Sequence, residues 1–304
     1  IRPMHDHSHG HHHLHEMTLK AIALPLGLSV FLVALKVYGW NETGSVSLLS
    51  SLLDSMMDIL ISTMNLAAVL YAAKPADDDH RHGHTAIEDI VGLVQASFIA
   101  ASAIYLFHEA VTRFLNPAEV QQPAIGAGVL VVSILVPLGI VLYQKRVLAK
   151  TKSVVLEADS LHYLTDLLMN ALIIVSILIA SQAGFGWVDP LLAFVIAGYI
   201  LWSAFQIGRR SFNHLMDKEV PEEQFAKIVE IIDAHQGTLG YHKLKTRMSG
   251  SKIFMQMHLD VDATLNVKQA HDIAEALEEK LMAAFADYNA EVIVHIDPKE
   301  VQGA

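Results

Sequence analysis

Six long apolar runs constrain the fold of this chain more than any other feature of its sequence. A helix that crosses a bilayer needs about 20 predominantly apolar residues, and each run meets that length. The links between the runs are short and contain helix breakers such as Gly44, Pro117 and Gly184. The sequence therefore predicts a membrane domain of six helices. The runs span roughly residues 19–40, 46–71, 87–114, 124–143, 155–180 and 188–207.

The composition agrees with a membrane protein that also has a soluble part. The 304 residues are 53% hydrophobic and 17% charged, whereas soluble domains carry about 25% charged residues. The net charge of −11 gives no reason to expect nucleic acid as a partner. No glycine-rich phosphate loop is present, so we expect no nucleotide. Because cysteine is absent, a soft metal would have to bind His and carboxylate side chains.

The segments that flank the apolar runs have a different composition. Residues 1–17 form a His-rich tail, which is either a weak metal binder or only a spacer, and we expect no cleavable signal peptide there. Residues 18–211 hold the predicted transmembrane domain, and residues 212–304 are charged and mixed. The pattern in this last segment predicts a small α+β cytoplasmic domain in the order α-β-β-α-β. Its expected elements are a helix at 221–235, strands at 241–248 and 252–262, a helix at about 267–285 and a strand at 291–296.

Lysine and arginine placement predicts the orientation in the membrane. Basic residues gather in alternate links, where they mark the cytoplasmic side. They are Lys74, Arg81, Lys145, Arg146, Lys150, Lys152, Arg209 and Arg210. The opposite links have only Arg113 at the margin of one run. Both termini are therefore expected in the cytoplasm.

Two of the apolar runs each contain two polar residues one helical turn apart. Asp54 and Asp58 lie in the second run, and His162 and Asp166 lie in the fifth. Residues i and i+4 share a helix face, and a carboxylate at membrane depth is costly without a partner. Two helices that each offer two ligands could enclose one four-coordinate metal ion. The alternative is that these are separate buried polar residues with local partners.

Two further clusters contain residue types that bind metals. Asp77-x2-His80-x3-His84 lies in the link between the second and third runs, where its spacing suits zinc, although a solvated loop can carry the same residues. The other set lies in the soluble segment, and its ligands exceed the needs of one tetrahedral ion. We therefore expect two ions bridged by its aspartate. The candidate ligands there are His242, His258, His271, His295 and Asp297.

Together these residues resemble the cation diffusion facilitator family, most closely its bacterial zinc and ferrous-iron efflux branch. The resemblance covers nearly the whole chain after the tail. Besides the paired polar residues of the two apolar runs, it is carried by segments 44–49 and 75–84, Lys245-Thr246-Arg247, Gln269-Ala270-His271 and His295-Ile296-Asp297-Pro298.

The resemblance implies a homodimer in the inner membrane of a bacterium, with a metallochaperone-like cytoplasmic domain that dimerises. It implies exchange of a divalent metal for protons by alternating access, with the membrane tetrad as transport site. The other two clusters would be accessory and dimer-stabilising sites. One position departs from the family: relatives often carry a lysine at the position of Ala86, which can pair with an aspartate here present as Asp217. We therefore expect the dimer to depend more on metal and packing in the soluble domain.

The ligand types narrow the choice of metal and of function. One imidazole with three carboxylates suits Zn²⁺, and Cd²⁺ by similarity, whereas Fe²⁺ and Mn²⁺ accept the same donors and stay open. His162 is the natural proton carrier, because imidazole titrates near neutral pH. Two rival functions are a membrane-anchored metalloenzyme and a metal sensor. An enzyme would need an open coordination position and a general base, and a sensor would function without residues 1–211.

Overall fold

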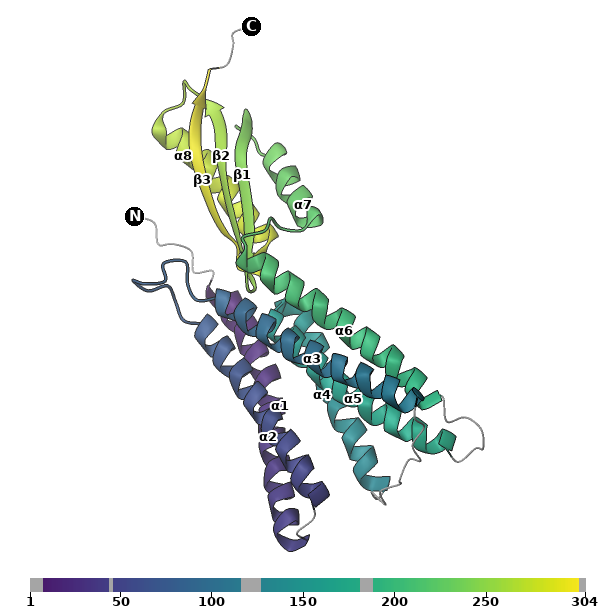
Figure 1. Cartoon of the computed structure of the whole chain (residues 1–304). Coiled ribbons are helices and arrows are strands. Elements are labelled where there is room, and N and C mark those ends of the chain that lie inside the picture. Colours follow the sequence, from purple (N-terminus) through teal and green to yellow (C-terminus); the bar gives the residue numbers. More distant parts are fainter. Residues whose placement is uncertain (1–7, 44–45, 116–126, 181–187, 301–304) are drawn as a thin grey trace. The chain divides into compact units, whose positions relative to one another are not determined.

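The computed structural model describes residues 8–43, 46–115, 127–180 and 188–300, although some side chains inside the helices, including that of Asp54, are not described. It divides into two compact units, one over His15–Phe212 and one that includes Asn213–Ala304. The first unit consists of six long helices (Figure 1). They are α1 (Ser8–Thr43), α2 (Val46–Ala72), α3 (Ala86–Leu115), α4 (Ala127–Thr151), α5 (Val154–Ala180) and α6 (Val188–Leu215).

Each predicted apolar run corresponds to one of these helices, so the prediction of a six-helix domain is confirmed. The helices extend beyond the runs. Helix α1 begins at Ser8, inside the His-rich tail. Helix α4 continues to Thr151, so the basic residues expected in a link lie instead on its last turns. Lys152, with a φ of 53°, and Ser153 then make the turn into α5.

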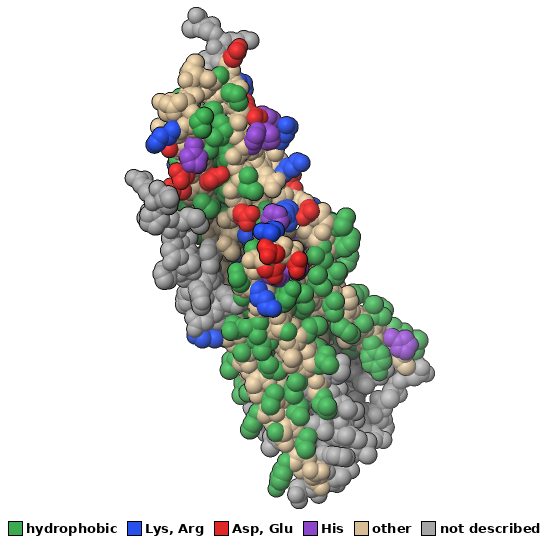
Figure 2. Space-filling model, turned by 90° about the vertical axis from the view of Figure 1, so that its left-hand side faces the viewer, with side chains coloured by type: hydrophobic (Ala, Val, Ile, Leu, Met, Phe, Trp, Pro, Cys, Tyr) green, Lys and Arg blue, Asp and Glu red, His purple; other side chains and the backbone are tan. Residues whose placement is uncertain are grey.

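The surface of the helical unit is apolar. Large hydrophobic side chains such as Phe31, Tyr105, Val195 and Trp202 are exposed. Figure 2 shows hydrophobic side chains over most of the described surface of the helices on this face. Among the described residues, segments Ala86–Thr112 and Leu191–Leu215 are long and apolar enough to cross a membrane by themselves. An exposed surface of this kind is suited to contact with lipid.

Helix α5 packs against α2, α3 and α4. Small residues allow close approach, as is common between membrane helices. Gly92 of α3 shows how tight the packing is, because a Cβ atom there would lie 2.6 Å from Cγ1 of Val154. Tyr163 of α5 and Ser62 of α2 are joined by a hydrogen bond of 3.3 Å between their hydroxyls. In this conformation the hydrogen bond joins α2 to α5 close to the level of His162.

The second unit has the expected order α-β-β-α-β. Strands β1 and β2 pair antiparallel, and β2 and β3 pair parallel, in the order β1-β2-β3. Strand β3 runs past its expected end to Lys299 and includes Pro298, which an edge strand tolerates. The elements are α7 (Glu222–Asp233), β1 (Gly240–Ser249), β2 (Lys252–Asp262), α8 (Val267–Ala284), a 3-10 turn (Ala286–Tyr288) and β3 (Glu291–Lys299).

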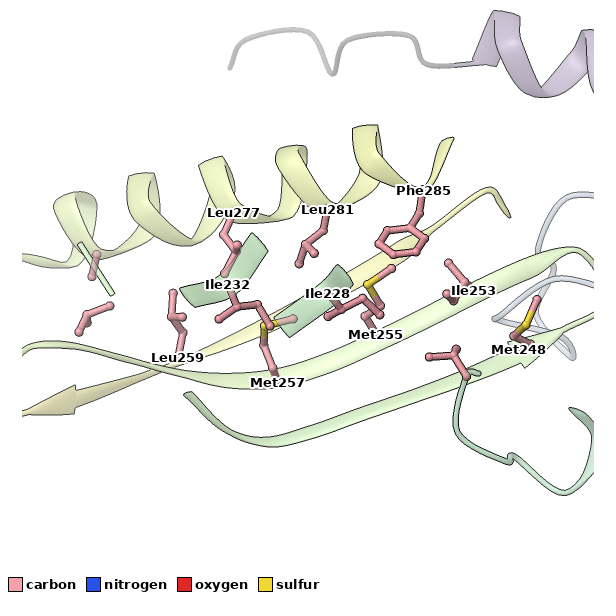
Figure 3. Close-up of a cluster of buried hydrophobic side chains, with 13 residues drawn as sticks. Ile228, Ile232, Met248, Ile253, Met255, Met257, Leu259, Leu277, Leu281 and Phe285 are labelled. Carbon is pink, nitrogen blue, oxygen red and sulfur yellow. The ribbon is translucent and has the colours of Figure 1, made fainter. Parts of the chain in front are cut away.

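Both helices of this unit contribute to one core on one face of the sheet. Met255 and Leu259 of β2 are buried with Leu277 of α8 and Ile232 of α7 (Figure 3). Alternate residues of a strand point to opposite faces. His258, between two buried residues of β2, therefore points away from this core.

Candidate metal centres

The first cluster joins two helices of the membrane unit. Oδ1 of Asp58 on α2 lies 3.2 Å from Nε2 of His162 on α5, and the same nitrogen lies 3.8 Å from Oδ2 of Asp166. Potential ligand atoms of the three residues all lie within 4.8 Å of one another. Their side chains are partly exposed. The side chain of Asp54 lies outside the described residues, and α2 places its backbone one turn before Asp58.

The second cluster lies in the link between α2 and α3. Oδ1 of Asp77 lies 3.3 Å from Nδ1 of His80, and Oδ2 of Asp77 lies 3.2 Å from Nε2 of His84. The backbone N–H of His80 donates to Asp77, and this bond, with the nearby imidazoles, holds the pKa of that carboxyl below its usual value. Nearby Asp78 pairs instead with Arg81 at 2.9 Å.

His84 has a contact that selects one of its ring nitrogens as a ligand. Its Nδ1 lies 3.3 Å from the carbonyl oxygen of Lys74. A carbonyl only accepts, so Nδ1 is the donor in this contact and Nε2 is the ring nitrogen left to bind a metal ion. Nε2 is the atom that points to Asp77. A hydrogen bond from the second ring nitrogen is the usual support of a metal-binding histidine.

The third cluster lies on the sheet face opposite the core. Oδ2 of Asp297, on β3, lies 3.1 Å from Nε2 of His242 and 2.9 Å from Nδ1 of His258. Its other oxygen, Oδ1, lies 3.1 Å from Nε2 of His295. A carboxylate with imidazoles on both oxygens has the arrangement needed to bridge two ions. Hydrogen bonding by His258, with the charge of the neighbouring histidines, holds the pKa of Asp297 below its usual value.

Two residues of this third cluster differ from the sequence prediction. His271 lies on α8, which packs on the opposite face of the sheet, so the structure does not bring His271 together with the other four candidate ligands of the same chain. Asp260 was not predicted, yet its Oδ1 lies 3.2 Å from Nδ1 of His242. A hydrogen bond from Lys299 to its other oxygen lowers the pKa of Asp260. The signal was available, because Asp260 follows His258 by two residues on a strand.

Comparisons with known proteins give the same picture for both units. The family model described as cation efflux transmembrane domain matches residues 22–216, and that described as cation efflux protein, cytoplasmic domain, matches residues 220–299. A protein of Shewanella oneidensis named cation-efflux pump FieF is 43% identical over 271 residues, which are 89% of this chain and 90% of that protein. A protein of the same name from Serratia proteamaculans is 38% identical over 274 residues, 90% of each chain.

Solved structures match a smaller part of the chain. The nickel form of a MamM CTD variant is 28% identical and covers 26% of this chain and 100% of its own, with a TM-score of 0.25. The zinc form of CzrB, described as a putative zinc transporter, is 29% identical and covers 29% of this chain and 99% of its own, also with a TM-score of 0.25.

Proposed function

Because this chain belongs to the cation efflux family, we propose that it exports Zn²⁺ from the cytoplasm in exchange for protons, by alternating access. As a member of that family it is an integral membrane protein that exports divalent cations, and it is a transporter and not an enzyme. The choice of zinc, the exchange with protons and the residues of the transport site are the parts that we propose.

One observation carries the assignment of the transport site. Asp58 and His162 come from different helices, and their ligand atoms lie 3.2 Å apart with Asp166 beside them. A metal held between α2 and α5 is released when the two helices move apart, which alternating access requires. We assign Asp58, His162 and Asp166 as ligands, and Asp54 as the fourth from its helical spacing.

The same ligands account for exchange with protons. A metal binds the neutral imidazole and the ionised carboxylates, so binding must displace any protons that these groups carry. His162 is in reach of two carboxylates, and the cluster can therefore hold either an ion or protons. The donor set of one imidazole and carboxylates favours Zn²⁺, with Cd²⁺ by similarity; Fe²⁺ or Mn²⁺ efflux by the same route is the alternative.

The transport site can be tested in proteoliposomes that contain a zinc-sensitive dye. We expect zinc uptake to follow an imposed pH gradient and to be abolished in Asp58→Ala and His162→Ala. Thr165→Ala is a matched control on α5, because this hydroxyl donates to the carbonyl of Leu161 on its own helix. Undiminished uptake by both substituted proteins would overturn the proposal. Parallel assays with Fe²⁺, Mn²⁺ and Cd²⁺ rank the metals.

We propose also that the chain forms a homodimer through its cytoplasmic domain, with metal at the Asp297 cluster. Position 86 is alanine here, where relatives often have a lysine that can pair with an aspartate, and this supports a larger role of the cytoplasmic domain in holding the dimer together. The corresponding aspartate, Asp217, pairs here with Arg247 of β1 at 3.3 Å. Light scattering with zinc and with chelator tests the proposal. Chelation, or the substitution Asp297→Asn, should shift the population toward monomer. An unchanged mass in both cases would refute the role of metal.

The proposed location is the inner membrane of a bacterium, with both termini in the cytoplasm. The basic residues at the ends of α4 and α6 support this orientation. The chain has no cysteine, so a single cysteine introduced by Glu300→Cys gives a clean probe. A membrane-impermeant thiol reagent should label it only after the cells are opened. Labelling of intact cells would reverse the orientation.

A further inference from the structure

A fully buried carboxylate lies one helical turn before His162 and belongs to none of the three clusters. Asp159 of α5 is 0% exposed. Its Oδ1 accepts a hydrogen bond of 2.7 Å from Nδ2 of Asn65 on α2, and its Oδ2 accepts one of 2.6 Å from Nε2 of Gln144 on α4. Both amides are 0% exposed as well. Asp159 is thus held by two uncharged donors from two other helices.

An ionised carboxylate in such a place is costly, because amide hydrogen bonds replace only part of its hydration. A buried charge usually has an ionic partner. The titratable groups that act on Asp159 through space are His162 and Tyr163 of its own helix and Asp58 of α2. Among the described residues, helix α4 contributes the amide of Gln144, which also lies against the α1 carbonyl of Ala21. The charge of Asp159 is therefore linked to the state of the transport site.

The two amides differ in their freedom to turn. Nε2 of Gln144 also lies 3.3 Å from the carbonyl oxygen of Ala21, so turning this amide would bring two acceptor oxygens together. In the part of the chain that the structure describes, Oδ1 of Asn65 and Oε1 of Gln144 are both buried without a hydrogen-bond partner, but the amide nitrogen of Asn65 has no second contact like that of Gln144 with Ala21. A half-turn of the Asn65 amide would present its Oδ1 to Asp159.

This arrangement suits both forms of the carboxyl group. An ionised carboxylate accepts from both amides, as observed. A protonated carboxyl donates one hydrogen bond and accepts another, which a fixed Gln144 and a turned Asn65 would provide. We propose that Asp159 binds a proton during the transport cycle, and that Asn65 turns its amide to accept that proton.

The proposal rests on the proposed function, and it adds a proton site that is separate from the metal ligands. A divalent ion beside Asp58 and His162 favours the ionised form of Asp159 by electrostatic attraction. An empty site, where carboxylates dominate, favours the protonated form. Arrival of the metal would then release the proton of Asp159 to water, and departure of the metal would allow another proton to bind.

The test is the number of protons released when zinc binds to the full-length protein in lipid nanodiscs. It is measured by titration calorimetry in two buffers with different protonation enthalpies. Asp159→Asn resembles the protonated form, since its amide can donate to a turned Asn65 and accept from Gln144. We expect this substitution to keep zinc binding and to release up to about one proton fewer per protomer. Release equal to that of the unmodified protein overturns the proposal.

Asp89→Asn is the matched control, because Asp89 of α3 is also a buried carboxyl of the helical unit, at 1% exposed. It should leave the proton count unchanged. An equal loss in Asp89→Asn would overturn the assignment to Asp159. Zinc uptake by the unmodified protein separates a failure of the proposed function from a failure of this inference. Without uptake the proposed function fails. Uptake together with an unchanged proton count in Asp159→Asn overturns only the proposal for Asp159.

A second measurement needs no substitution at Asp159. Infrared difference spectra of the protein with and without zinc should show loss of a protonated-carboxyl C=O band when zinc binds. In Asn65→Ala that band should move in frequency, because the carboxyl loses its hydrogen-bond acceptor. The absence of the band, or a band that Asn65→Ala leaves in place, contradicts the proposal.

Discussion

His84 shows how a single contact prepares a side chain for one role. Its imidazole is 2% exposed, and the Lys74 carbonyl directs Nε2 to Asp77. We expect His84→Ala to weaken zinc binding at this loop by at least about tenfold, in line with the effect of losing support for a metal ligand. Equilibrium dialysis of the full-length protein measures it. His82→Ala, two residues away, should have little effect, and an equal loss there would assign the ion to different ligands.

Asp262 makes stability depend on pH through two hydrogen bonds. Its Oδ1 accepts from the backbone N–H of Thr264 at 2.8 Å and from the Thr264 hydroxyl at 2.7 Å, and these bonds hold its pKa below the ordinary value of 3.8. The ionised form is the one stabilised by folding. Its contribution is therefore complete above the ordinary pKa and is lost as pH falls through the lowered pKa.

We accordingly expect Asp262→Ala to be less stable than the unmodified protein at neutral pH, with a difference that disappears in strong acid. Urea unfolding of the C-terminal unit at several pH values measures it. Thr264→Val removes only the hydroxyl contact and should retain part of the effect. A difference that stays constant with pH would show that the carboxylate charge plays no part.

Residue spacing predicts neighbours on one element better than partners on another. The i, i+4 spacing of His162 and Asp166 gives a shared face from helix geometry alone. The spacing of His258 and Asp260 already placed both on one strand face, but the contact of Asp260 with His242 depends on the register of β1 against β2, which no local pattern specifies. His271 does not meet the other four candidate ligands within one chain, and spacing could not indicate this for a related reason. Its place on a helix does not say which sheet face that helix covers.

At the scale of elements, the hydrogen bonds at the start of α8 contribute measurably to the free energy of unfolding. The side chain of Asn266 accepts from the backbone N–H of Gln269, and the Gln269 side chain accepts from the backbone N–H of Asn266. Loss of such a cap typically costs about 1 kcal/mol. We expect Asn266→Ala to lower the free energy of unfolding of the C-terminal unit by that amount, measured in urea.

Lys268→Ala is the control for this helix end. Lys268 is exposed and its contact with Asp272 is long, at 3.4 Å, so its removal should change stability by less than about 0.5 kcal/mol. Equal effects of the two substitutions would mean that general helix propensity, and not the cap, sets the stability of this end.

Elements were predictable wherever one periodicity dominated. The alternation of Met255, Met257 and Leu259 predicted β2 with its observed bounds, since one face meets a core. Ends were less predictable. Helix α4 continues through a basic segment because charged side chains at its last turns can remain solvated, and β3 continues through Pro298 because an edge position needs no donor there.

At the scale of the molecule, composition separates the two units and gives each its own reporter. All the tryptophans, Trp40, Trp187 and Trp202, precede residue 213, so tryptophan fluorescence follows the unfolding of the helical unit. The C-terminal unit has its own core and its own group of side chains that could hold a metal ion, and its unfolding appears in circular dichroism without a tryptophan signal. The apolar runs were enough to predict this division, although the metal clusters themselves stay a prediction.

If the two units bind metal independently, zinc should stabilise each one through its own ligands. A ligand that binds only the folded state adds about 2.7 kcal/mol at a concentration 100 times its Kd. We expect zinc to raise both unfolding temperatures, followed by fluorescence and by circular dichroism. Asp297→Asn should remove the zinc-induced rise in the unfolding temperature of the C-terminal unit, which circular dichroism follows. His162→Ala should reduce the rise in the unfolding temperature of the helical unit, which fluorescence follows. If either substitution abolished both rises, the units would share one metal-dependent transition, and metal binding in the cytoplasm would be coupled to the membrane site.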